Sequence, residues 1–183
     1  QSRVGPLKWI SPSTEDVIVD PRTSYSIAKR FNEIYLAAIF EEVGIESVSL
    51  RFFNVYGKNQ DDRMVIPKFF TQAVNNKPIT VFGDGNQTRD FTYIDDVIKS
   101  SIELAKLSNN SSEIYNIANG SEYTIKDLAK EIICVTNSTS KINYIDVPKK
   151  RYDFEVERRF GNSNKLFSAI NYKPNTSLMN GLK

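Results

Sequence analysis

The chain has 183 residues, enough for one domain or one and part of another, and its 40% hydrophobic and 25% charged residues are typical of a soluble globular protein. Its net charge is only +2 and its basic residues are scattered, which argues against a dedicated nucleic-acid surface. No apolar run approaches the ~18 residues of a membrane helix. The chain contains no histidine, which excludes Ser-His-Asp and Cys-His catalysis within it and argues against a zinc site, so we predict no metal.

The first part of the sequence predicts a loop, a helix and a strand. Residues 1–24 are rich in proline, serine and threonine, which predicts a loop. Ser24 is a suitable N-cap for a helix over residues 25–43, and Gly44 ends this helix. Its apolar period of 3.6 residues comes from Ile27, Phe31, Ile34, Tyr35 and Ala38. Alternating β-forming residues then predict a strand over residues 47–53.

The remaining residues alternate between helical and strand patterns, so the fold class is α/β. A helix is expected to begin with Asp95 or Asp96 as its cap, and Thr124 with Asp127 is typical of a capping box. The predicted elements are helices over residues 67–75, 95–107, 124–133 and 164–170, and strands over 79–82, 113–117 and 142–147. The single cysteine, Cys134, falls in a helical apolar stripe, which predicts core packing, and the lack of a disulfide within the chain favours a reducing, cytoplasmic location.

Tyr25 and Lys29 lie four residues apart near the start of the first predicted helix. That spacing places the two side chains on one helical face, within reach of each other. An ammonium beside a phenol favours the phenolate, which can take a proton from a hydroxyl group. Such pairs also occur by chance on many helices, so the pair alone does not define a site.

Three sequence blocks carry a family resemblance. They are SYSIAKR at residues 24–30, LRFFNVYG at 50–57 and VFGDGNQTRDFTYIDDV at 81–97. In this order and spacing they resemble the extended short-chain dehydrogenase/reductase family, in its NAD-dependent epimerase/dehydratase branch. The resemblance implies the C-terminal part of an extended Rossmann-type fold. Residues 1–57 would be the remnant of a dinucleotide-binding domain with the catalytic helix, and 58–183 a small mixed α/β substrate-binding domain, with some segments returning to the first.

The glycine-rich turn that opens proteins of this family is missing from the sequence. None of the eight glycines forms a Gly-x-x-Gly-x-x-Gly pattern. Gly83 and Gly85 are the one close pair, but Arg89 follows them instead of a strand-to-helix turn. We therefore expect the chain to correspond to the C-terminal portion of a larger enzyme, to bind NAD⁺ poorly alone and to be inactive in isolation.

The resemblance assigns catalytic and cofactor roles. The family's cofactor is NAD, and Tyr25 would be the base that deprotonates a sugar hydroxyl. Lys29 would hold the nicotinamide ribose, and Phe52 or its neighbour Phe53 would pack near the nicotinamide. Ser2 is a loose match to the family's serine that hydrogen-bonds the reacting hydroxyl, and a terminal serine without a role is the alternative.

The resemblance also assigns residues to the nucleotide sugar. Arg89 would bind the diphosphate with bidentate hydrogen bonds, although a surface ion pair with Asp90 or Asp84 is an alternative. Asn54 would contact the sugar nucleotide, or else be a turn asparagine. The remaining positions are Pro67 and Phe82 at the base ring, and Arg151 and Asp153 at phosphate and ribose. For Phe82 the alternative is core packing, and for Arg151 and Asp153 it is a solvated charged face, with Glu155 as another possible acid.

The implied function is a UDP-hexose 4-epimerase that works through a 4-keto sugar. A dTDP-glucose 4,6-dehydratase and a UDP-glucuronate decarboxylase are chemical alternatives within the family. A truncated, non-catalytic remnant that binds a nucleotide sugar or a protein partner is an alternative of another class. The expected partners are a UDP-sugar and, for the intact enzyme, a second copy in a homodimer, with neither nucleic acid nor membrane.

Overall fold

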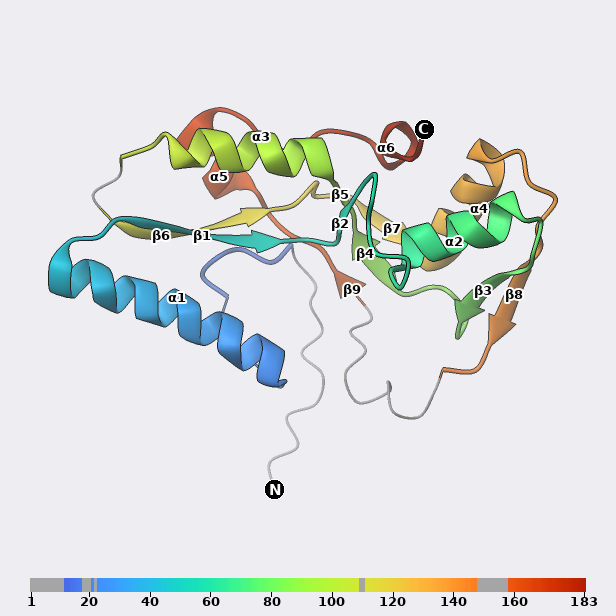
Figure 1. Cartoon of the computed structure of the whole chain (residues 1–183), viewed down its shortest axis with the longest axis horizontal. Coiled ribbons are helices and arrows are strands. Elements are labelled where there is room, and N and C mark those ends of the chain that lie inside the picture. Colours follow the sequence, from blue (N-terminus) through green and yellow to red (C-terminus); the bar gives the residue numbers. More distant parts are fainter. Residues whose placement is uncertain (1–11, 18–20, 22, 109–110, 148–157) are drawn as a thin grey trace, which may run out of the picture.

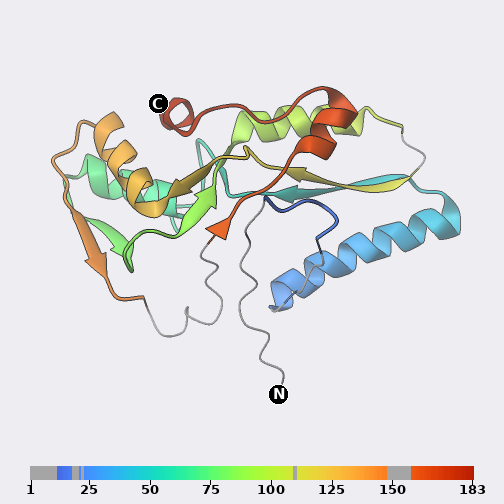
Figure 2. The ribbon, with the colours of Figure 1, turned by 180° about the vertical axis from the view of Figure 1, so that it is seen from behind.

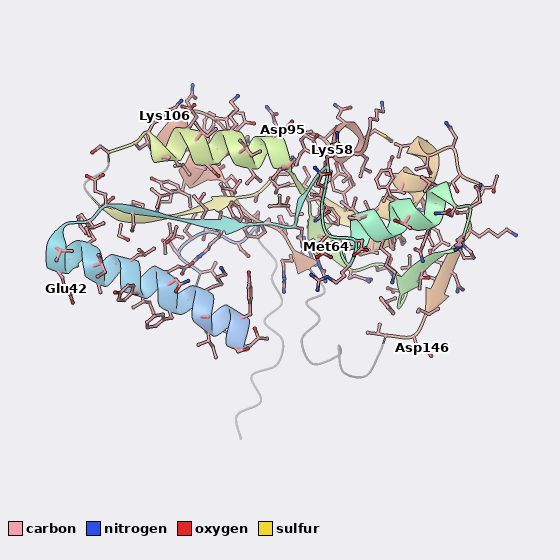
Figure 3. All side chains as sticks on the ribbon, in the orientation of Figure 1. Glu42, Lys58, Met64, Asp95, Lys106 and Asp146 are labelled. Atoms are coloured by element: carbon pink, nitrogen blue, oxygen red, sulfur yellow. The ribbon has the colours of Figure 1, made fainter. Side chains whose placement is uncertain are left out.

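The computed structural model describes residues 12–17, 21, 23–108, 111–147 and 158–183. The elements gather in two groups along the long axis of the molecule, with short strands between them (Figure 1). The loop that leads from the first group to the second runs past Lys58 to Met64 between the groups (Figure 3). The mixed α/β architecture with parallel strands agrees with the predicted fold class.

The first group is a three-layer arrangement around a parallel pair of strands. β1 (Ser47–Phe52) pairs in parallel with β6 (Ser112–Ile117), in register from Ser47 opposite Ser112 to Phe52 opposite Ile117. α1 (Ser24–Val43) covers one face, and α3 (Ile94–Ala105) and α5 (Asn164–Ile170) cover the other (Figures 1 and 2). Parallel strands with helices on both faces are the Rossmann-type arrangement.

α1 begins one residue earlier than its sequence predicts. Thr23, not Ser24, is the N-cap, and its hydroxyl accepts a hydrogen bond of 3.1 Å from the backbone N–H of Ser26. The Ser26 hydroxyl in turn accepts from the N–H of Thr23, which completes a capping box. Gly44 ends the helix as predicted, with φ of 71°, a conformation that glycine adopts without strain.

The apolar stripe that predicts α1 does not face a core. α1 has no buried residue, and Phe31 and Ile34 are 62% and 55% exposed. The helix is instead fastened to β1 by a half-buried ion pair, in which Arg51 donates to both carboxylate oxygens of Glu33 at 2.8 Å. Arg30 donates to the same carboxylate at 2.8 Å. The attachment of α1 therefore combines this ion pair with half-buried side chains such as Leu36, Ile39 and Phe40.

The second group contains the larger hydrophobic core. α2 (Val65–Val74) and α4 (Ile125–Val135) pack beside the parallel pair of β3 (Ile79–Phe82) and β8 (Ile142–Ile145). The short C-terminal helix α6 (Leu178–Leu182) packs against α4 of this group. The fully buried side chains at its centre include Phe69, Ala73, Ile79, Val81, Leu128 and Ile132.

Short strands connect the two groups. β2 (Val55–Tyr56) pairs in parallel with β5 (Thr92–Tyr93). A three-stranded sheet has the order β7 (Glu122–Thr124), β4 (Thr88–Asp90), β9 (Arg158–Arg159). None of these short strands, nor α6, was predicted from the sequence. The division into domains at residue 57 stays a prediction, although α3, β6 and α5 pack beside β1 from beyond that residue.

Some local predictions are confirmed and others are wrong. Thr124 caps α4 as predicted, and its hydroxyl accepts from the N–H of Asp127 at 3.0 Å. The cap of α3 is Tyr93 and makes no side-chain bond, so the predicted capping by Asp95 or Asp96 is wrong. Cys134 is exposed rather than packed in the core, because α4 buries the face of Leu128, Ala129 and Ile132.

Asp96, rejected as a cap, anchors the C-terminal segment. Its buried carboxylate accepts hydrogen bonds from the Tyr172 hydroxyl at 2.5 Å and from the Thr176 N–H at 2.9 Å.

The helix α2 begins at Val65, two residues before its predicted start. Pro67 therefore lies in the first turn of the helix, where a proline costs no hydrogen bond. In the part of the chain that the structure describes, no helix is both long and apolar enough to cross a membrane.

Candidate active site

The candidate site lies where the two groups meet. The carboxyl ends of β1 and β6 and the first turn of α1 all point towards the middle of the molecule (Figure 1). In open α/β sheets, ligands bind outside the carboxyl ends of the strands. Phe52, the last residue of β1, is 53% exposed there, and Asn54 follows with φ of 34°. This edge is therefore the place to locate the predicted site residues.

Tyr25 and Lys29 lie together, as their spacing predicts. The Lys29 ammonium nitrogen is 5.5 Å from the centre of the Tyr25 ring. Tyr25 is 72% exposed, so its hydroxyl is open to a ligand and no described residue hydrogen-bonds it. A phenol with an ammonium beside it and free access is chemically suited to proton transfer.

Asp90 holds several segments of the site together. Its carboxylate is fully buried and accepts hydrogen bonds from the backbone N–H groups of Asn119 at 3.1 Å, Gly120 at 2.9 Å and Gly161 at 3.1 Å. Its backbone carbonyl accepts from the side-chain amide of Asn54 at 2.9 Å. One aspartate thus ties the ends of β1, β6 and β9 to β4.

The burial of Asp90 changes its protonation. Burial raises the pKa of the Asp90 carboxyl to about 6, although the N–H donors of Gly161, Gly120 and Asn119 favour the charged form. Nearby Glu122 adds to the rise through charge repulsion. From its sequence position alone, Asp90 was expected only as an alternative ion-pair partner of Arg89. The sequence does contain one indication of a separate role for Asp90. Side chains alternate along a strand, so Asp90 lies on the face opposite Arg89.

Arg89 lies on β4 directly before this aspartate. Its side chain is half-buried and donates to the backbone carbonyl of Thr88 at 2.7 Å. Because consecutive strand residues point to opposite faces, the Asp90 carboxylate and the Arg89 guanidinium emerge on different sides of the sheet. Asp84, the other alternative partner, accepts hydrogen bonds from Asn86 at its own turn.

Asn54 and the two predicted base contacts occupy defined positions. The Asn54 amide donates to the Asp90 carbonyl, which leaves its carbonyl oxygen as the group available to a ligand. Phe82, the last residue of β3, is half-buried and therefore not part of the core, and the Lys68 ammonium lies 5.6 Å from the centre of its ring. Pro67 precedes Lys68 on α2, which packs against β3.

Three predicted site residues, Ser2, Arg151 and Asp153, lie outside the described residues. Among the residues that the structure does describe, no group of three acidic or cysteine side chains is arranged to hold a metal ion.

Sequence and structure comparisons identify related proteins. A model described as the NAD dependent epimerase/dehydratase family matches residues 3–118. The chain is 34% identical to the UDP-N-acetyl-alpha-D-glucosaminuronate decarboxylase of Bacillus cytotoxicus, over 88% of this chain and 51% of that protein. The UDP-N-acetylglucosamine 4-epimerase of Methanobrevibacter ruminantium M1, solved with UDP-N-acetylmuramic acid, is 30% identical with a TM-score of 0.86, over 97% of this chain and 56% of that one.

A second solved structure is the UDP-glucuronic acid 4-epimerase of Bacillus cereus in complex with UDP-glucuronic acid and NAD. It is 30% identical with a TM-score of 0.83, over 94% of this chain and 54% of that one. The chain thus spans about half the length of the curated relatives that it matches. The family model covers more than half of the chain, and the Rossmann-type layers agree with it. On this evidence the chain belongs to the NAD-dependent epimerase/dehydratase family.

Proposed function

We propose that the protein acts on nucleotide sugars as an NAD-dependent enzyme of the UDP-hexose 4-epimerase type. The observation that carries the proposal is the Lys29 ammonium 5.5 Å from the ring of an exposed Tyr25, at the end of α1 that points to the carboxyl ends of β1 and β6. Proton transfer at a sugar hydroxyl requires such an accessible base. The two 4-epimerases of known structure described above support the same reaction.

The residues present fit one end of the dinucleotide. An exposed ammonium and phenol can hydrogen-bond ribose hydroxyls, and the exposed ring of Phe52 offers an apolar surface to the nicotinamide. The sequence provides no glycine-rich turn for the pyrophosphate. When bound, NAD⁺ supplies the acceptor for a hydride from the sugar carbon.

Each residue then has a distinct task. Tyr25 takes the proton of the sugar hydroxyl, and the Lys29 ammonium keeps a positive charge beside the Tyr25 ring. Arg89 binds the diphosphate, because a planar guanidinium matches phosphate oxygens two at a time. The free amide oxygen of Asn54 accepts a hydrogen bond from the nucleotide sugar.

The test replaces the base and keeps the helix. In the intact enzyme, Tyr25→Phe removes the proton acceptor, and we expect the interconversion of UDP-glucose and UDP-galactose, assayed with added NAD⁺, to slow by roughly 10²–10⁴-fold. Lys29→Ala should also slow it. Tyr35→Phe is the matched control, because Tyr35 is on the same helix, 54% exposed and stacked on Phe31. Near-full activity of Tyr25→Phe would end the catalytic assignment.

Product analysis decides between reactions within the family. UDP-glucuronic acid that loses carbon dioxide would indicate a decarboxylase; the Bacillus cytotoxicus relative is named as a decarboxylase of another acidic sugar nucleotide, UDP-N-acetyl-alpha-D-glucosaminuronate. dTDP-glucose that loses water would indicate a dehydratase. A second candidate is a nucleotide-sugar-binding protein without activity. Tight binding of a UDP-sugar without turnover of any of these substrates would support that candidate.

We also propose that the intact protein is a homodimer. The exposed apolar stripe of α1 supports this, because contiguous apolar surface on a soluble protein usually marks an interaction site. Phe31 and Tyr35 stack in this stripe with ring centres 5.8 Å apart. Sedimentation velocity over a range of protein concentrations measures the state directly, and a monomer throughout would contradict the proposal.

A further inference from the structure

The three-stranded sheet β7-β4-β9 places a second arginine beside Arg89. In the register of the sheet, Tyr123 on β7, Arg89 on β4 and Arg159 on β9 occupy one row. Thr124, Thr88 and Arg158 occupy the adjacent row. Residues in one row share a face, and consecutive residues of a strand point to opposite faces. Arg89 and Arg159 therefore present their guanidinium groups on the same face of the sheet.

The two arginines of β9, Arg158 and Arg159, differ in their ion-pair partners. On the face of Thr88, Arg158 forms a bidentate ion pair with Glu122, whose carboxylate also accepts from the Thr88 hydroxyl at 2.6 Å. The Arg158 guanidinium holds the pKa of the Glu122 carboxyl below its usual range. On the opposite face, Arg159 is exposed and makes no ion pair with any described residue.

Arg89 and Arg159 are directly paired in register, with Tyr123 in the same row. An anion with several oxygen atoms is the ligand that two adjacent guanidinium groups bind best.

We infer that Arg159 is a second binding residue for the anionic part of the nucleotide sugar, next to the contact of Arg89. This inference rests on the proposed function, because it uses the same ligand. Two parts of such a ligand have the required chemistry. One is the diphosphate, and the other is the carboxylate of an acidic sugar such as the UDP-glucuronic acid bound by the Bacillus cereus epimerase.

Calorimetric titration of the purified protein with UDP, UDP-glucose and UDP-glucuronic acid tests the inference. Arg159→Gln removes the charge and should weaken binding about tenfold or more, as expected for a charge-assisted hydrogen bond. Equal losses for all three ligands would assign Arg159 to the diphosphate. A loss confined to UDP-glucuronic acid would assign it to a sugar carboxylate. Arg159→Lys, which keeps the charge without the planar fork, should bind between parent and Arg159→Gln.

Arg158→Gln is the matched control, since it removes the same charge from the neighbouring position on the opposite face. It should leave the affinity for all three ligands within about twofold of the parent, as expected for an exposed ion pair. If Arg159→Gln binds all three ligands like the parent, or if Arg158→Gln weakens them equally, the inference is wrong. A parent protein that binds none of the three would instead overturn the proposed function itself.

Discussion

α1 presents Tyr25 without one buried residue, whereas β4 presents Arg89 beside a fully buried aspartate. The Tyr25 side of the site depends on an ion pair between Glu33 and Arg51 and on half-buried contacts with the β1–β6 pair. The Arg89 side depends on backbone hydrogen bonds to Asp90 and on the packed core around α2 and α4. The residues that we propose for proton transfer and for phosphate binding are thus held in place by different interactions, so mutations near them should have different effects.

The largest expected difference comes from matched substitutions in the two regions. Phe69 on α2 is 2% exposed, and Phe31 on α1 is 62% exposed. Phe69→Ala removes a buried ring and should lower the free energy of unfolding by about 3–5 kcal/mol. Phe31→Ala should change it by less than about 0.5 kcal/mol, measured where the protein is monomeric. Urea unfolding of both variants measures these changes. Equal losses of unfolding free energy in the two variants would contradict the proposed difference between the two regions.

The next largest effect concerns ligand binding at the rigid side. Arg89→Ala should weaken UDP and UDP-sugars by about 1.5–3 kcal/mol, because charge-assisted hydrogen bonds to the diphosphate disappear. The free sugar should be unaffected. Lys130→Ala is a suitable control, since Lys130 is an exposed residue of α4 paired only with Asp127 among the described residues. An Arg89→Ala variant that binds UDP like the parent would restrict Arg89 to a surface role.

Asp90→Asn tests the hydrogen bonds that hold the rigid side together. Asparagine offers one acceptor oxygen, and its amide group would face backbone N–H donors. A buried donor left unpaired costs about 1–3 kcal/mol, so the free energy of unfolding at pH 7 should fall by about that amount. Asp95→Asn, at an exposed position on α3, is the control and should have almost no effect.

The same variant should change how stability depends on pH. The pKa of Asp90 is raised in the folded protein to about 6 from an ordinary value of 3.8, so the folded state binds more protons between these values. The contribution of Asp90 to stability is therefore complete below pH 3.8 and is lost as the pH rises through about 6. Unfolding free energies of parent and Asp90→Asn should therefore differ most below pH 3.8 and converge as the pH rises through about 6, and a constant difference would contradict the assignment.

The smallest expected effect is at Asn54. Asn54→Ala removes a neutral hydrogen bond to the ligand and should weaken UDP-sugar binding by about 0.5–1.5 kcal/mol. The same substitution also removes the bond to the Asp90 carbonyl, so calorimetry should be accompanied by thermal unfolding. Unchanged affinity with lowered stability would leave Asn54 as a turn residue only.

Local sequence patterns predicted the parts of the site that depend on neighbouring residues. The approach of Lys29 to Tyr25 follows from helical spacing, and the strands at 47–52 and 79–82 follow from β-forming residues. Periodicity also predicted an apolar stripe on α1, but the sequence does not reveal what covers such a stripe. Phe31 is therefore in the expected helix with an unexpected exposure.

The parts that were missed depend on residues far apart in the sequence. The carboxylate of Asp90 meets the N–H of Gly161, 71 positions away, and no local pattern contains this contact. β4 and β9 are too short to give a periodic signal in the sequence. The pairing of Arg89 with Arg159 could therefore not be predicted before the fold was known. Cys134 shows a smaller error of the same kind, because rotation of α4 by a fraction of a turn decides which residues are buried.

The ion pair of α1 sets an order of events on acidification. The Arg51 guanidinium holds the pKa of the Glu33 carboxyl below its usual range, so this contact persists above that range and is lost as the pH falls through the lowered pKa. Phe69 and the other side chains of the α2–α4 core have no such titration. In acid, the contact that fastens the helix of Tyr25 should therefore weaken while the apolar α2–α4 core remains packed. Amide hydrogen exchange would then show one half of the site becoming labile before the other.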